Sequence, residues 1–328
     1  MRAPAFWGAP PGLAAALLAP LGAAYAGAGR LRRRLAAPER AGVPVLCIGN
    51  LVAGGAGKTP VALAVARALR GQGHDVHFLS RGYGGRERGP LRVDPVVHDA
   101  AAVGDEPLLL AEMAPAWVAR DRAAGARAAA AAGAGMLVLD DGFQNPALAK
   151  DLSLLVVDGG YGIGNGRVMP AGPLREPMAE GLARADAVVL IGEDERGLAP
   201  ALGGAGPLLR ARLMPEPGMA AWLKDRRVVA FAGIGRPEKF FATLRGLGAV
   251  AVSETAFPDH HPYRPEEVMT LVERAAALGA APVTTRKDLV RLPREAQAMV
   301  HALPVAVAWE EPARLDRLLR DRFGQADG

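Results

Sequence analysis

The segment "NLVAGGAGKTP" at residues 50–60 constrains the fold of this chain more than any other. Four apolar residues, 45–48, precede it and predict a buried strand, and residues 61–70 after it have the pattern of a helix that ends at Gly71. A strand, a glycine loop, a Lys–Thr pair and a helix are the parts of a phosphate-binding P-loop. The general motif expects glycine where this chain has Val52. We therefore expect a backbone at Val52 that does not need a positive φ.

The loop contains each group that a nucleoside triphosphate requires. Backbone N–H groups at a helix N-terminus bind phosphate oxygens, glycines allow close approach, a lysine contacts the phosphates and a hydroxyl ligates Mg²⁺. We expect these roles at Gly54, Gly55, Ala56, Gly57, Lys58 and Thr59. The alternative is a glycine-rich turn that binds nothing.

Short apolar runs alternate with helical segments along the chain, which predicts an α/β fold with a mostly parallel sheet flanked by helices. The runs before residue 215 lie at 45–48, 76–79, 136–139, 154–157 and 187–191. The pattern then restarts, with strands expected at 228–232, 250–252, 283–285 and 305–307. We expect an N-terminal membrane-associating helix over residues 1–35, a P-loop domain over 36–215 and a smaller C-terminal α/β domain over 216–328.

Two carboxylates, Asp140 and Asp141, directly follow the predicted strand 136–139. In P-loop proteins a carboxylate in this place holds Mg²⁺ beside the hydroxyl of the loop. An aspartate after a strand can also simply form a turn, but the P-loop earlier in the same sheet favours the metal role.

Two further polar segments are ambiguous on spacing alone. Asp105 precedes a predicted helix with Pro107 in its first turn, which is also typical of an ordinary N-cap. Asp259, His260 and His261 could form a solvated loop, and a shared metal is disfavoured because adjacent residues of an extended chain point in opposite directions.

The N-terminal segment carries no charge from residue 3 to residue 29, and an arginine cluster follows at Arg30, Arg32, Arg33 and Arg34. It could be a secretory signal, a membrane span or a helix on the membrane surface. Pro20 is expected to kink the helix and makes a full span marginal. A P-loop that uses cytosolic ATP disfavours the signal, so we favour a surface anchor with Phe6 and Trp7 at the interface.

Charge and cysteine content exclude other classes. The net charge of +5 is scattered along the chain rather than gathered in one patch, so we expect no nucleic-acid partner. The single cysteine, Cys47, excludes an intramolecular disulfide and a multi-cysteine metal site, and its predicted strand makes it a buried thiol.

Taken together, these segments resemble one family, the tetraacyldisaccharide 4′-kinases, which are the lipid A 4′-kinases of Gram-negative envelopes. The resemblance rests on eight motifs in order: "PAFWG" at 4–8, "GNLVAGGAGKTP" at 49–60, "SRGYGG" at 80–85, "VGDEP" at 103–107, "LDDGFQN" at 139–145, "GNGRVMPAGPLREP" at 164–177, "FPDHHPY" at 257–263 and "TTRKD" at 284–288. The glycine loop of the family likewise lacks the opening glycine. Two positions depart from the family: Asn145, where histidine is usual, and Arg286, where an acidic residue is usual.

The resemblance implies a reaction and a place for it. A kinase of this kind transfers the γ-phosphoryl group of ATP, with Mg²⁺, to the 4′-hydroxyl of a tetraacyldisaccharide 1-phosphate, which gives lipid IVA. The acceptor is a membrane lipid, so the resemblance implies work at the cytoplasmic face of the inner membrane, with no obligatory protein partner. The competing hypothesis is a membrane-associated P-loop ATPase switch without a lipid acceptor.

The resemblance also assigns roles to residues. It implies that Lys58 contacts the phosphates and that Asp105 is the general base, oriented by His260. It implies phosphate contacts from Arg81 and Arg175. The implied Mg²⁺ site consists of Thr59, Asp140, Asp141 and Glu176.

Overall fold

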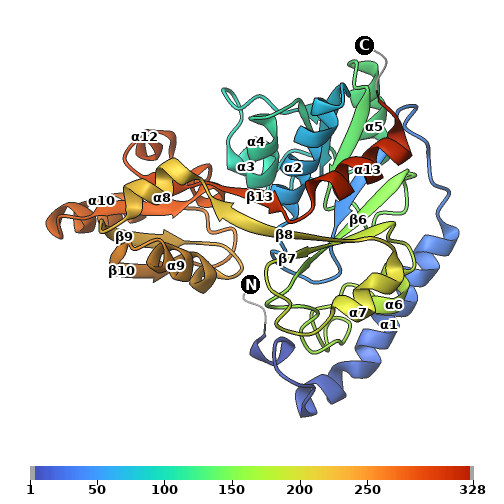
Figure 1. Cartoon of the computed structure of the whole chain (residues 1–328), viewed down its shortest axis with the longest axis horizontal. Coiled ribbons are helices and arrows are strands. Elements are labelled where there is room, and N and C mark those ends of the chain that lie inside the picture. The colour runs from blue at the N-terminus through green and yellow to red at the C-terminus, as the bar shows by residue number, and fades with distance from the viewer. Residues whose placement is uncertain (1–3, 326–328) are drawn as a thin grey trace.

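The computed structural model describes residues 4–325, and its larger sheet forms the centre of the larger of two domains (Figure 1). Within those residues it has nine strands in the order β13-β8-β7-β6-β1-β5-β2-β4-β3. The strands are β1 (Val45–Gly49), β2 (Val76–Ser80), β3 (Leu91–Arg92), β4 (Ala116–Val118), β5 (Met136–Asp140), β6 (Leu152–Asp158), β7 (Ala187–Ile191), β8 (Leu208–Pro215) and β13 (Val305–Trp309). The edge strands β3 and β13 pair antiparallel with their neighbours, and the strands between them run parallel.

The central strands are buried along their whole length because helices cover the sheet. Each residue of β1, β5, β6 and β7 is buried, which is the pattern of a parallel sheet with both faces covered. Cys47 lies in β1 as predicted, and burial raises the pKa of its thiol to about 11. The predicted α/β class is confirmed.

Most helices of the described chain are short. The helices are η1 (Ala5–Trp7), α1 (Leu13–Leu35), α2 (Lys58–Gly71), α3 (Ala100–Val103), α4 (Asp105–Ala111), α5 (Arg122–Ala131), α6 (Met178–Leu182), α7 (Ala199–Leu202), η2 (Gly203–Ala205), α8 (Pro217–Leu223), α9 (Pro237–Gly246), α10 (Pro265–Ala277), α11 (Arg286–Leu289), α12 (Arg294–Gln297) and α13 (Pro312–Phe323). The longest are α1, α2, α10 and α13. Helices α2, α4 and α5 pack on the strands that end near the predicted site.

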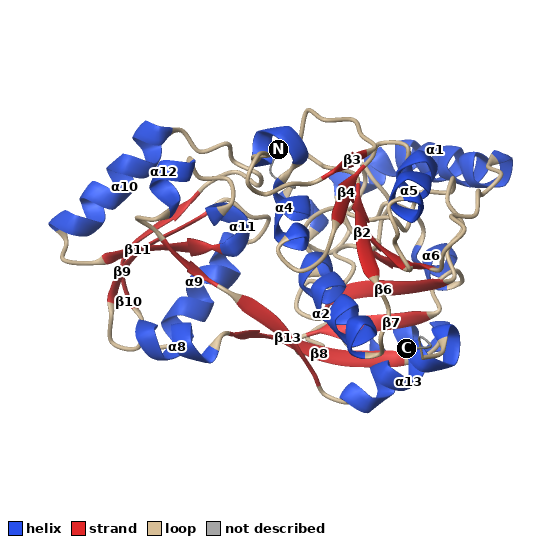
Figure 2. Ribbon diagram, turned by 90° about the horizontal axis from the view of Figure 1, so that it is seen from above, coloured by secondary structure: helices blue, strands red, loops and turns tan. Residues whose placement is uncertain are grey.

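The smaller domain has its own parallel sheet, in the order β10-β9-β11-β12 (Figure 2). Its strands are β9 (Arg227–Ala232), β10 (Val250–Ala256), β11 (Ala281–Thr285) and β12 (His301–Leu303). Phe240, Phe241 and Leu244 of α9 pack in one apolar cluster, and Val268 and Leu271 of α10 pack in a second. The domain therefore has apolar cores of its own.

The chain returns to the larger sheet at its C-terminal end, which differs from the expectation of one unit over residues 216–328. β13 pairs with β8, and Leu315 and Leu319 of α13 are buried in the main core. The predicted strand at 305–307 exists but belongs to the larger sheet. β8 and β13 run side by side toward the smaller domain in both views and join it to the larger one (Figures 1 and 2).

Helix α1 is continuous through Pro20 and packs on the larger domain by a face of small residues. Ala15, Gly22 and Ala26 are buried, and a Cβ on Gly22 would lie 2.8 Å from the Val168 carbonyl oxygen. Among residues 4–325, no helix combines the length and the apolar character that crossing a membrane requires. The first three residues of the predicted 1–35 segment lie outside the described chain.

Candidate active site

The glycine loop lies between β1 and α2, as its sequence predicts. Gly57 adopts φ 83° as the N-cap of α2, and Gly54 adopts φ 114°, values that a side chain at these positions would strain. Val52 is absent from the described non-glycine residues with positive φ, which confirms the expectation for its backbone. Val52 is instead buried and forms an antiparallel bridge with Leu174, so an apolar side chain has a structural use there.

Lys58 and Thr59 begin α2 and connect the loop to the ends of neighbouring strands. Lys58 Nζ donates a hydrogen bond of 3.2 Å to Asn50 Oδ1 and lies 3.7 Å from Asp141 Oδ1. Thr59 Oγ1 donates a hydrogen bond of 3.0 Å to Asp140 Oδ2. The structure therefore brings together the lysine, the hydroxyl and both aspartates that the sequence singled out.

Asp140 fits a magnesium site at the end of β5. Within residues 4–325 its Oδ1 is buried without a hydrogen-bond partner, while Oδ2 accepts from Thr59. Burial and the charge of nearby Glu106 raise the pKa of Asp140 to about 7, against the opposing charge of Lys58. One carboxylate and one hydroxyl are enough protein ligands for Mg²⁺, which takes its remaining ligands from phosphates and water. Across the described chain, three or more His, Cys, Asp or Glu side chains do not gather around one metal position.

Asp141 and Glu176 are each engaged by arginine. Arg175 Nη1 donates 2.7 Å to Asp141 Oδ1, and Asp141 has φ 56°. Glu176 is 2% exposed and accepts two hydrogen bonds, 2.7 and 2.6 Å, from Arg184 Nη2. Both oxygens of Glu176 therefore accept from a cation, whereas for Asp141 the contacts with Arg175 and Lys58 involve Oδ1.

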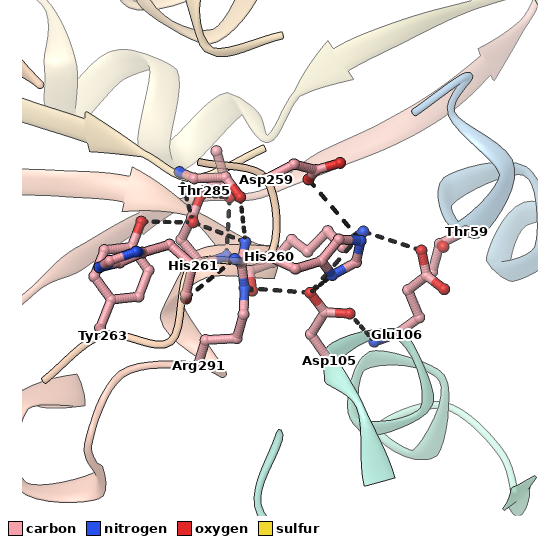
Figure 3. Close-up of polar contacts among 12 residues, drawn as sticks. Thr59, Asp105, Glu106, Asp259, His260, His261, Tyr263, Thr285 and Arg291 are labelled. Atoms are coloured by element: carbon pink, nitrogen blue, oxygen red, sulfur yellow. Dashed lines mark hydrogen bonds and ion pairs between the residues drawn. The ribbon is translucent and has the colours of Figure 1, made fainter. Parts of the chain in front are cut away.

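Asp105 and His260 come together from opposite domains (Figure 3). Asp105 is the first residue of α4 and 2% exposed, and its Oδ2 lies 3.0 Å from His260 Nδ1. His260 adopts φ 56°, and its backbone N–H donates to the Gly233 carbonyl at the end of β9. A pair separated by 155 positions in the chain is thus held in hydrogen-bond contact across the domain boundary.

Two cations beside Asp105 were not predicted from the sequence. Arg291 Nε lies 3.2 Å and Lys287 Nζ 3.9 Å from Asp105 Oδ2. Burial opposes ionisation of Asp105, but the His260 hydrogen bond and these cations outweigh it and hold its pKa below the ordinary value. Lys287 lies in the quoted motif "TTRKD", which is the one signal that could have identified it.

The predicted phosphate contacts Arg81 and Arg175 differ in their surroundings. Arg175 contacts Asp141, as described, whereas Arg81 follows β2 and is exposed. Arg81 is close to Arg122, a buried arginine that sequence reasoning missed. Burial and the charge of Arg81 lower the pKa of Arg122 to about 10.

A cleft of about 810 Å³ opens beside the Asp105–His260 pair. Both domains line it, with Tyr83, Asp105 and Leu108 on one side and His260 and Arg291 on the other. The Tyr83 ring lies 5.0 Å from the His260 ring. A cleft of this size with a paired carboxylate at its wall can hold a polar molecule against a proton acceptor.

The chain is similar to proteins of one family along nearly its whole length. The sequence model of the family described as tetraacyldisaccharide-1-P 4′-kinase matches residues 14–324. The tetraacyldisaccharide 4′-kinase of Rhodospirillum centenum is 64% identical over 99% of this chain and 100% of its own length. That of Rhodospirillum rubrum is 57% identical over 98% of this chain and 99% of its own.

A solved structure is similar in fold as well. The crystal structure of LpxK from Aquifex aeolicus in complex with ATP matches with a TM-score of 0.76 and 30% sequence identity. The match covers 94% of this chain and 99% of that one.

Proposed function

The chain belongs to the tetraacyldisaccharide 4′-kinase family, and from that premise we propose that Asp105, Lys58 and Thr59 carry the family's reaction at the boundary between the two domains. The enzyme is an ATP-dependent kinase of lipid A biosynthesis. It transfers the γ-phosphoryl group of ATP to the 4′-hydroxyl of a tetraacyldisaccharide 1-phosphate, and the product is lipid IVA. The hydrogen bond between Asp105 and His260 is the observation that carries the assignment of the base.

The glycine loop binds the triphosphate. The backbone N–H groups of residues 54–57 face the phosphates at the N-terminus of α2, and Lys58 neutralises charge on the β- and γ-phosphates. Its hydrogen bond to Asn50 and its distance of 3.7 Å to Asp141 keep the ammonium group at the loop. Arg175 and Arg81 supply further positive charge for phosphate groups.

Thr59 and Asp140 would hold Mg²⁺, for which the buried, unpartnered Asp140 Oδ1 is the support. When bound, the ion neutralises charge on the β- and γ-phosphate oxygens. Asp141 and Glu176 stay predictions as further ligands, since Arg175 contacts Asp141 Oδ1 and Arg184 contacts both oxygens of Glu176.

Asp105 accepts the proton of the acceptor hydroxyl. As the hydroxyl oxygen bonds to the γ-phosphorus, the bond from that phosphorus to the β–γ bridging oxygen breaks and ADP leaves. His260 orients the carboxylate from the other domain, so the base is assembled only when the domains are together. The cleft of about 810 Å³ has room for part of a disaccharide headgroup beside this carboxylate.

Helix α1 is the proposed anchor of the enzyme at the membrane surface, on the cytoplasmic face of the inner membrane where ATP is present. Leu13, Leu17 and Leu21 are 77%, 71% and 58% exposed on the face away from the protein. Arg32 and Arg34 are exposed and can meet anionic headgroups, whereas Arg30 and Arg33 pair with Glu180. A lipid acceptor requires such contact, because its acyl chains stay in the bilayer.

A transfer assay tests the function. The full chain is incubated with γ-labelled ATP, Mg²⁺ and tetraacyldisaccharide 1-phosphate, and label is measured in the chloroform-extractable lipid. We expect lipid labelling by the wild type and about a 10²- to 10⁴-fold slower rate for Asp105→Asn and Lys58→Ala. Asp321→Asn, an exposed aspartate on α13, is the control and should match the wild type. Release of free phosphate without labelled lipid would instead support an ATPase switch and refute the kinase assignment.

A further inference from the structure

The boundary between the domains is lined by charges that meet at the N-terminus of α4. Lys287 Nζ of α11 donates 3.0 Å to Glu106 Oε1 and lies 3.9 Å from Asp105 Oδ2. Arg286, next to it, pairs with Glu112 at the C-terminal end of α4. The two acidic residues that begin α4 thus face cations of the smaller domain (Figure 3).

Arg291 is held more firmly than an ordinary ion-pair partner. Its side chain is 5% exposed, and Nη2 donates 2.8 Å to Asp288 Oδ1 and 2.9 Å to the Gly233 carbonyl. Asp288 is fully buried and also accepts from the Tyr263 hydroxyl at 2.7 Å. This network fixes the guanidinium, whose Nε–H donates 3.1 Å to the Lys287 carbonyl, so that Nε lies within ion-pair distance of Asp105 Oδ2, at 3.2 Å.

The same network holds the histidine of the pair. Gly233, which accepts from Arg291, also accepts the backbone N–H of His260 at 3.0 Å. Arg291 Nη1 donates to the His261 carbonyl at 3.4 Å. One buried arginine therefore connects the loop that carries His260 with the carboxylate that His260 contacts.

We propose that Arg291 is a positioning residue for the phosphoryl transfer, which holds the Asp105 carboxylate in place and ionised from within the smaller domain. The proposal rests on the proposed function, in which Asp105 accepts the hydroxyl proton. Arg291 acts on the reaction through the Asp105 carboxylate, and Lys287, four residues earlier in the chain, assists it.

The charges around Asp105 give the direction of the effect. His260, Lys287 and Arg291 face it as donors or cations, while Glu106 and Asp288 are anions that pair with Lys287 and Arg291. Burial alone favours the protonated carboxyl, so loss of a cation raises the pKa of Asp105. A protonated Asp105 cannot accept a proton, so the activity is lost at low pH and recovered as the pH rises.

The test is the pH profile of kcat/KM for the lipid acceptor in Arg291→Gln. We expect the acidic limb of this profile to move to higher pH by about one unit or more. At acidic pH this shift lowers kcat/KM by about tenfold more than at alkaline pH. The KM for ATP should stay within about twofold of the wild type, because Arg291 contacts the base and not the glycine loop. Lys287→Gln leaves the ion pair between Arg291 and Asp288 intact. It should shift the acidic limb in the same direction, by a smaller amount than Arg291→Gln.

Arg286→Gln is the matched control, since it removes a neighbouring interdomain ion pair that does not include Asp105. Its pH profile should be that of the wild type. The proposal would be overturned if Arg291→Gln lost the same fraction of activity at every pH. If Arg291→Gln does not fold, an unshifted acidic limb in Lys287→Gln would overturn it instead. A wild type that labels no lipid would instead be a failure of the proposed function, so the two failures are distinguishable.

Discussion

At the scale of single residues, the Thr59 hydroxyl has one role that its methyl group cannot supply. It donates 3.0 Å to Asp140 Oδ2, while Asp140 Oδ1 stays buried without a partner among the described residues. In the proposed function Thr59 and Asp140 would hold Mg²⁺. The hydroxyl would then contribute to metal affinity, and the rest of the side chain to packing at the start of α2.

Thr59→Val keeps the shape of the side chain and removes the hydroxyl. We expect the Mg²⁺ concentration for half-maximal activity to rise by about tenfold or more, as is usual when a ligand or its partner is lost. Thr59→Ser retains the hydroxyl and should need close to the wild-type concentration. A Mg²⁺ titration of initial rates measures both, and identical titrations for Thr59→Val and wild type would exclude Thr59 from the metal site.

At the scale of elements, α1 divides into two faces that the sequence could not assign. Its exposed residues Leu13, Leu17, Leu21, Leu31 and Leu35 fall within an arc of about 80° at 100° per residue, opposite the buried small residues. The uncharged stretch in the sequence favoured a surface anchor over a span or a signal, but it did not identify the residues that face the protein. The two faces are set by packing between residues distant in sequence, such as that of Gly22 against the Val168 carbonyl. Pro20, where the sequence predicted a kink, does not end the helix, because α1 continues on both sides of it.

Leu17→Glu tests the exposed face of α1. A charge there should lower binding to vesicles of anionic and zwitterionic phospholipid by about tenfold, since it removes apolar contact and adds repulsion. The melting temperature should change little because the side chain is 71% exposed. Val97→Glu, at an equally open loop position, is the control and should bind vesicles like the wild type. Co-sedimentation measures both, and unchanged binding by Leu17→Glu would contradict the proposed anchor.

At the scale of the whole molecule, the sequence predicted local structure better than it predicted which strands pair over long distances in the chain. The strand–loop–helix around Lys58 and the buried run of β5 before Asp140 are local, and the structure has both. The return of β13 to β8 could not be predicted, because an apolar run of five residues fits either sheet and its partner lies about ninety positions away.

The site shows the same division between local and distant information. The residues of the glycine loop follow from spacing, whereas Asp105 and His260 were linked only by the family resemblance. Arg291 was not predicted as a site residue, because its role depends on its contact with Asp105, a residue of the other domain that is distant in sequence. Further ion pairs cross the boundary at the glycine loop, where Arg236 Nη2 lies 2.6 Å from Asp158 Oδ2 and 3.0 Å from the Gly55 carbonyl. The two domains therefore meet both at the predicted base and at the predicted phosphate loop.

The central claim is that Asp105 and His260, from separate domains, act as one unit on the acceptor hydroxyl. A double-mutant cycle on kcat for lipid phosphorylation tests it directly, with Asp105→Asn, His260→Gln and both together. We predict a loss of at least about 10²-fold for Asp105→Asn, a smaller loss for His260→Gln, and a double variant no slower than Asp105→Asn within about twofold. Independent, multiplicative losses, or a His260→Gln variant with the full wild-type kcat, would contradict the account.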